Sequence, residues 1–151
     1  MKNLKRLIPL FVLLLMISIH TKVSAQNSDE IVGEWVNPSG EGKIRIFKSG
    51  DYYYGTLFWL KNPNNEKGEP KLDEKNPDIT KRNRKIQGLM ILKSFSFNSK
   101  DKVWENGEIY DPKSGKTYSC VMKLDAANKL SIRGFVGISL IGRSEVWTRV
   151  Q

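Results

Sequence analysis

Few side chains in this sequence are suited to acid–base, nucleophilic or metal chemistry. The chain has one histidine, His20, and one cysteine, Cys120. Zinc, copper and non-haem iron sites depend on several His or Cys ligands, and Ser-His-Asp and Cys-His nucleophiles need an imidazole. No spacing of acidic residues supports the carboxylate pair of a glycosidase, so a carboxylate-based hydrolase is only a minor alternative. We therefore expect a protein that is not an enzyme and that uses neither a metal nor a cofactor.

The N-terminus has the three-part pattern of a secretory signal peptide. Residues 1–6 carry three basic residues and no acid, residues 7–19 are an apolar run, and small residues surround Ala25. The run has 13 residues, whereas a helix needs roughly 20 to cross a hydrocarbon core, so a retained membrane anchor is the weaker alternative. We predict cleavage after Ala25, export to the periplasm or beyond, and no remaining transmembrane segment.

Export changes the composition of the working protein. Residues 1–25 hold four basic residues, no acid and the only histidine, so the formal net charge falls from +9 to +5. The remaining 126 residues fit one domain, 26–151. Cys120 alternates with Met122 and Leu124, which predicts a buried, inert thiol; an intermolecular or reactive role is the alternative.

Turn residues divide the mature chain into short segments rich in β-favouring residues. We predict eight strands, at residues 31–37, 43–48, 52–60, 89–97, 103–110, 116–124, 129–136 and 144–150. Eight antiparallel strands joined by short turns favour an up-and-down barrel, with a two-sheet sandwich as the alternative. An interior of this size holds packed side chains or one small ligand.

One long polar segment, residues 61–87, interrupts the series of strands. It contains three prolines, and Asn76, Pro77 and Asp78 could begin a short helix. Four cations lie within residues 81–85, among them Arg82 and Arg84, which we consider as binding sites for an anionic partner. Alternatively, these arginines pair with Asp73 or Asp78 and hold the segment in place. No aromatic residue interrupts the cluster, so nucleic acid is not an expected partner.

Motifs along residues 31–150 resemble those of the DUF2147 family, whose members are secreted bacterial proteins of uncharacterised function with a lipocalin-like barrel. The resemblance rests on Ile31 to Trp35, the segment 55–60, Pro70 to Asp73, Asn76 to Asp78, Arg82, Arg84, Gly88, Leu89, the run 107–118, and the run 133–140 with Gly142, Arg143, Trp147, Thr148 and Arg149. The resemblance implies a lipocalin-like fold and export. It implies no particular activity, because the function of the family is unassigned. Gly33, Glu34 and Trp35 resemble the G-x-W of lipocalins, with Arg149 placed to stack on the indole and close the barrel.

The most aromatic segment is residues 52–60. Simple alternation places Tyr53, Leu57 and Trp59 on one face, where they either line a pocket or fill the barrel. Ile138, Leu140 and Arg143 would form a rim loop, either exposed as an entrance or folded in. We therefore predict a binder of a small apolar or amphipathic ligand, with Tyr53, Trp59, Ile138, Leu140 and Arg143 as contacts. The alternative is a solid barrel that binds an anionic envelope component or a protein through residues 61–87.

Overall fold

The structure is a computed structural model that describes residues 27–138 and 141–151; the predicted signal peptide lies outside the described residues. Eight strands form one antiparallel barrel, as predicted. They are β1 (Gly33–Val36), β2 (Gly42–Ser49), β3 (Tyr52–Leu60), β4 (Met90–Asn98), β5 (Val103–Asp111), β6 (Lys116–Ala126), β7 (Lys129–Phe135) and β8 (Gly142–Arg149).

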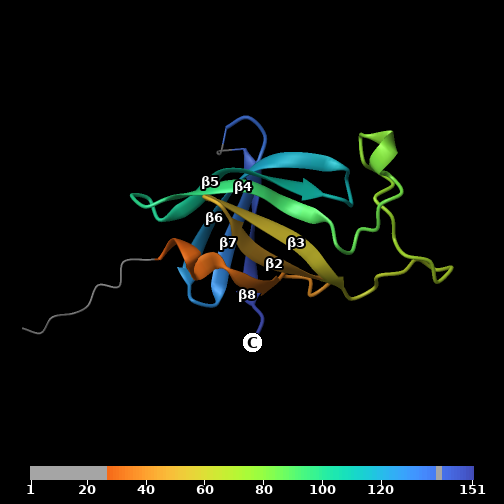
Figure 1. The fold of residues 1–151 in the computed structure, drawn as a ribbon, viewed down its shortest axis with the longest axis horizontal. Coiled ribbons are helices and arrows are strands. Elements are labelled where there is room, and N and C mark those ends of the chain that lie inside the picture. The colour runs from red at the N-terminus through yellow and green to blue at the C-terminus, as the bar shows by residue number, and fades with distance from the viewer. Residues whose placement is uncertain (1–26, 139–140) are drawn as a thin grey trace, which may run out of the picture.

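The sheet closes on itself because β1 pairs with both β2 and β8. Each strand from β2 to β7 pairs with its two neighbours in the chain, so the barrel is up-and-down (Figure 1). Closure leaves no sheet edge with a free row of backbone donors and acceptors. The sandwich alternative is therefore wrong for this chain.

The first predicted strand begins two residues later than expected, because residues before it form a 3-10 helix, η1 (Ser28–Ile31). Asn27 and Glu30 form a capping box, in which the Asn27 side chain accepts from the Asp29 N–H and the Glu30 side chain accepts from the Asn27 N–H. Gly33 then has a φ of +140°, and a Cβ there would lie 2.6 Å from a guanidinium nitrogen of Arg149. Only glycine combines this backbone turn with so close an approach.

The long segment between β3 and β4, residues 61–89, extends to one side of the barrel (Figure 1). Its helical part is one 3-10 turn, η2 (Ile79–Lys81), capped by Asp78, whose side chain accepts a hydrogen bond from the Thr80 N–H. Two isolated bridges, Asn64 with Pro70 and Leu72 with Lys85, fold the segment back on itself. The segment therefore has a defined conformation and is held by local pairing.

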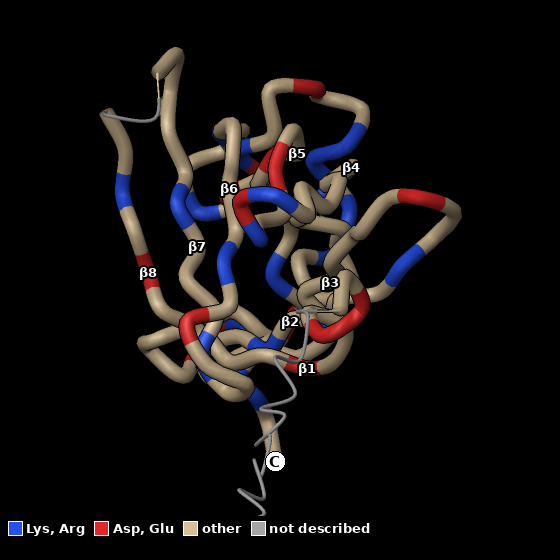
Figure 2. Tube along the Cα trace, turned by 90° about the vertical axis from the view of Figure 1, so that its left-hand side faces the viewer, with Lys and Arg blue, Asp and Glu red and all other residues tan. Residues whose placement is uncertain are grey.

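The core fills one end of the barrel with large side chains. Trp35, Trp104, Tyr53 and Phe95 are fully buried, and Phe95 packs where a Cβ on Gly107 would collide with its ring. Cys120 is also buried, as predicted, and burial raises the pKa of its thiol to about 12. Basic and acidic residues are interspersed around the barrel rather than gathered on one face (Figure 2).

Candidate ligand-binding site

A cavity of about 960 Å³ occupies the barrel at the end away from η1. Aliphatic side chains from the strands form much of its wall, and its mouth is bordered by the β1–β2, β5–β6 and β7–β8 connections and by the 61–89 segment. The apolar part of the lining comprises Ile44, Leu57, Leu60, Ile86, Ile91, Ile109, Ile132, Phe135, Val136, Ile141 and Trp147. Sites for small molecules typically enclose about 300–1,000 Å³, so this cavity has room for one.

Tyr53, one of the predicted ligand contacts, lies outside this lining. Its ring packs edge-on against Trp104, and its hydroxyl donates a 2.6 Å hydrogen bond to Asp29 at the closed end. That bond and a second one from Lys48 lower the pKa of Asp29. The Trp104 indole donates to the carbonyl of Ser28, so η1 is fastened over the closed end by both aromatic residues.

Trp59, another predicted contact, is also absent from the lining. The β2–β3 register shifts between Lys43 and Ile44, which inserts one extra residue in β3 and reverses the alternation beyond it. Leu57 and Leu60 both line the cavity, whereas the Lys43 ammonium lies 4.9 Å from the Trp59 ring centroid. Simple alternation placed Trp59 on the same face as Leu57, and Leu60 on the opposite face. In the structure it is Leu60 that lines the cavity with Leu57, so the assignment of these two side chains was wrong.

The β7–β8 connection borders the mouth, as its position in the sequence suggested. Ile138 is 60% exposed and lies outside the lining, whereas Val136, Ile141 and Arg143 belong to it. Leu140 lies outside the described residues. The entrance interpretation of this connection remains a prediction.

Two lysines tie the segments around the mouth together. Lys75 Nζ donates a 2.7 Å hydrogen bond to the carbonyl of Lys113, and Lys113 Nζ donates a 2.7 Å bond to Glu41. The hydrogen bond from Lys113, together with its charge, lowers the pKa of Glu41. The 61–89 segment, the β5–β6 turn and the β1–β2 loop are thus linked in series.

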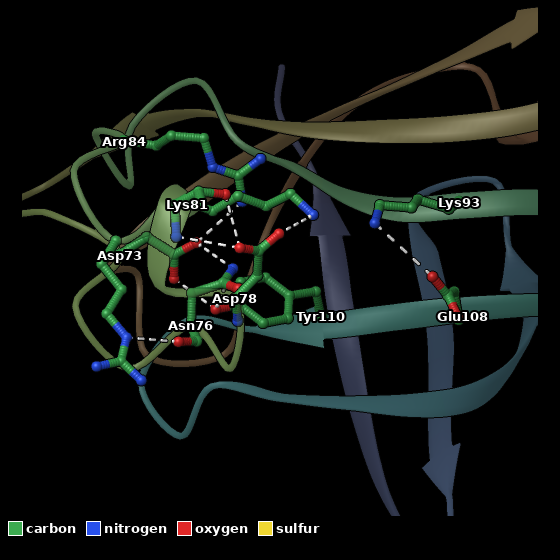
Figure 3. Close-up of polar contacts among 10 residues, drawn as sticks. Asp73, Asn76, Asp78, Lys81, Arg84, Lys93, Glu108 and Tyr110 are labelled. Carbon is green, nitrogen blue, oxygen red and sulfur yellow. Dashed lines mark hydrogen bonds and ion pairs between the residues drawn. The ribbon is translucent and has the colours of Figure 1, made fainter.

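A buried polar cluster, which we call the loop anchor, fastens the 61–89 segment to β5 (Figure 3). Asp73 is fully buried; its carboxylate accepts a hydrogen bond from the Tyr110 hydroxyl, one of 2.8 Å from Asn76 Nδ2 and one of 3.1 Å from Arg84. Burial, followed by the neighbouring Asp73 carboxylate, raises the pKa of Tyr110 to about 12. A buried carboxylate needs such partners to offset its lost hydration.

The two arginines predicted to bind an anion both have partners within the segment. Arg84 pairs with Asp73 in the loop anchor, and Arg82 Nε donates a 2.7 Å hydrogen bond to the carbonyl of Asn76. Lys81 pairs with Asp78 at 2.8 Å, and the pKa of Asp78 falls to about 2 because of that bond and those from Thr80. This arrangement matches the alternative in which the cations hold the segment in place; anion binding remains a prediction.

The seam of the barrel brings together Trp35 and Arg149, which are directly opposed on β1 and β8. The Arg149 guanidinium carbon lies 4.2 Å from the Trp35 ring centroid, and the Trp35 indole donates to the carbonyl of Ile31. Partial burial lowers the pKa of Arg149, and the charge of Glu30 opposes that change. Both residues therefore join strands at the closed end and lie apart from the cavity.

Sequence reasoning did not name Glu145 and Trp147 as ligand contacts, although both line the cavity from β8. The alternation of Glu145 with Trp147 was the available signal, since it places a carboxylate on the same face as a buried indole. Within residues 27–138 and 141–151, no group of three or more His, Cys, Asp or Glu is arranged to hold a metal. No helix in those ranges is long and apolar enough to span a membrane.

Comparison with known proteins places the barrel in a wider context. One solved structure with the same fold is protein HP1028 from the human pathogen Helicobacter pylori, described as belonging to the lipocalin family. It is 18% identical, the match covers 80% of this chain and 82% of that chain, and the TM-score is 0.69, so the likeness establishes a lipocalin-like fold. No curated protein matches the chain.

A family model described as "Uncharacterized protein conserved in bacteria (DUF2147)" matches residues 33–149. The resemblance noted in the sequence is thereby confirmed. Because that match spans most of the 151 residues, the chain belongs to the DUF2147 family of bacterial proteins.

Proposed function

We propose that this protein binds a small, largely apolar ligand inside its barrel and catalyses no reaction on it. The observation that carries the proposal is the cavity of about 960 Å³ with its aliphatic wall. Transfer of apolar surface from water into such a wall is favourable by roughly 25 cal/mol per Å². The lipocalin-like fold is consistent with an interior ligand site, since barrels of eight strands can enclose one small molecule.

Gly134 offers a way to fill the cavity without disturbing the barrel. A Cβ at this position would meet Ile109 and Tyr118 at 3.6 Å, which is ordinary van der Waals contact. Gly134→Leu should therefore place a bulky side chain among the lining residues. Val146→Leu is a matched control, because Val146 is 46% exposed on the outer side of the adjacent β8 strand.

Binding can be measured with the neutral fluorophore N-phenyl-1-naphthylamine, whose emission rises in apolar surroundings. We expect saturable binding to the wild type, a loss of about tenfold or more in affinity for Gly134→Leu, and no change for Val146→Leu. Circular dichroism establishes that each variant folds. Unchanged affinity in a folded Gly134→Leu protein would contradict the proposal, and mass spectrometry of extracts from the natively purified protein would identify the ligand.

We also propose that the mature protein acts in the bacterial envelope, in the periplasm or outside the cell. The proposal is supported by the basic, apolar and small-residue pattern of residues 1–25. The intact mass of protein purified from its native source should correspond to a chain that begins at Gln26. A mass that includes residues 1–25 would contradict it.

A further inference from the structure

Strand β8 places three different chemical groups along one wall of the cavity. Arg143, Glu145 and Trp147 are spaced by two residues and all line it. The exposed fraction of the Arg143 side chain is 89%, that of Glu145 is 40%, and Trp147 is 3% exposed overall. A carboxylate thus lies on the wall between a cation at the mouth and an indole further in.

The Glu145 carboxylate has capacity for further hydrogen bonds. The Trp147 indole donates to Oε2 at 3.4 Å, and Arg143 forms an ion pair with Oε1 at 3.8 Å, which is beyond hydrogen-bond distance. A carboxylate has about four acceptor positions. On β7 the residue opposite Glu145 is Ile132, whose side chain has no hydrogen-bond donor.

The other two acids in the described lining are already engaged by protein groups. Glu41 receives the Lys113 ammonium at 2.7 Å. The Asp111 carboxylate accepts from the Lys113 N–H at 2.9 Å and from the Ser114 hydroxyl at 2.7 Å, which stabilises its own turn. Glu145 is therefore the acid best able to contact a ligand.

We infer that the cavity selects amphipathic molecules with a protonated amine, whose ammonium group pairs with Glu145 while the hydrocarbon part lies against the aliphatic wall. This inference rests on the proposed function and specifies the class of ligand. The Trp147 indole, which also lines the cavity, adds an aromatic face that attracts a cation. Arg143 and Lys71, the lining cations that are not bound to Glu41, compete less effectively for an anionic group, because their exposed charges are screened by water and salt.

The experiment is displacement of N-phenyl-1-naphthylamine by three ten-carbon molecules at pH 7: decylamine, decan-1-ol and decanoic acid. Each is used below the concentration at which it forms micelles or a separate phase. We expect decylamine to displace the fluorophore at about a tenfold lower concentration than decanoate, with decanol between them. Glu145→Gln keeps the shape of the side chain and removes its charge, so decylamine should lose this advantage while decanol is unaffected. Glu108→Gln is the control, because it removes one carboxylate charge that pairs with Lys93 outside the cavity lining, and it should leave the order unchanged.

The outcomes separate the inference from the function on which it rests. Equal displacement by all three molecules, or preference for decanoate, overturns the inference and leaves an apolar binding site. An unchanged preference for decylamine in Glu145→Gln also overturns it. Failure of all three to displace the fluorophore from the wild type contradicts the proposed function itself.

Discussion

Arg149 lies over the indole of Trp35 and also donates hydrogen bonds to three backbone carbonyls. Its Nε bonds to Ala127 at 2.8 Å, one terminal nitrogen to Val32 at 3.0 Å and the other to Glu30 at 2.6 Å. One planar side chain on the last strand thus holds η1, the approach to β1 and the β6–β7 turn. The stability of the closed end of the barrel therefore depends on the three hydrogen bonds of this guanidinium group.

Arg149→Lys should therefore destabilise the protein by about 2 kcal/mol, because an ammonium cannot donate in the same three directions and leaves carbonyls unpaired. Arg45→Lys is the control, since Arg45 pairs with Glu34 on the exposed outer face and such pairs contribute about 0–1 kcal/mol. Urea unfolding measures the change in the free energy of unfolding for both variants. Equal effects of the two substitutions would show that the bonds of Arg149 carry no special stability.

The Tyr110 hydroxyl should control how firmly the 61–89 segment is held. Tyr110→Phe removes its hydrogen bond to the buried Asp73 carboxylate, which then has fewer partners to offset its lost hydration. We expect faster tryptic cleavage within residues 61–89, measured by mass spectrometry, and a loss of about 1–2 kcal/mol of stability. Tyr52→Phe, at a residue that is 48% exposed, should change neither. Unchanged cleavage in Tyr110→Phe would mean that other contacts hold the segment.

The number of strands was predictable because turn residues and β-favouring runs act locally. The face of the sheet on which the Trp59 side chain lies was not predictable, because it depends on a register shift between Lys43 and Ile44 that no local pattern reveals. The pairing of Asp73 with Arg84 was among the alternatives that the sequence suggested, but the hydrogen bond from Tyr110, 37 residues away, was not. The spacing of Gly33, Trp35 and Arg149 was informative because barrel closure itself brings the first and last strands together.

The β5–β6 turn and the 61–89 segment meet so closely at Gly115 that a side chain there has no space. Gly115 has a φ of +72°, and an added Cβ would collide with the carbonyl oxygen of Lys75. Gly68, with a φ of +79°, has open space around it and serves as the matched control. Gly68→Ala should cost about 1 kcal/mol through backbone strain alone, whereas Gly115→Ala should cost about 1–3 kcal/mol more. Thermal unfolding measures the difference, and equal melting temperatures would refute the close packing of these two segments.

Cys120 should make the protein less stable at alkaline pH. Burial raises the pKa of its thiol from 9.0 to about 12, so the unfolded chain loses this proton at a lower pH than the folded protein. Between those two values the unfolded state binds fewer protons, and the free energy of unfolding falls as pH rises. Tyr110 contributes in the same direction, since its pKa is raised from 10.0 to about 12.

Substitution of the thiol separates the two contributions. Urea unfolding of Cys120→Ala at pH 8 to pH 11 should show a shallower decline than the wild type, and the decline that remains includes the part due to Tyr110. The native thiol should also react with iodoacetamide at least on the order of a hundredfold more slowly than the urea-unfolded chain at pH 8, because a buried thiol forms little thiolate. Parallel stability curves for wild type and Cys120→Ala, or rapid labelling of the folded protein, would contradict a buried, inert Cys120.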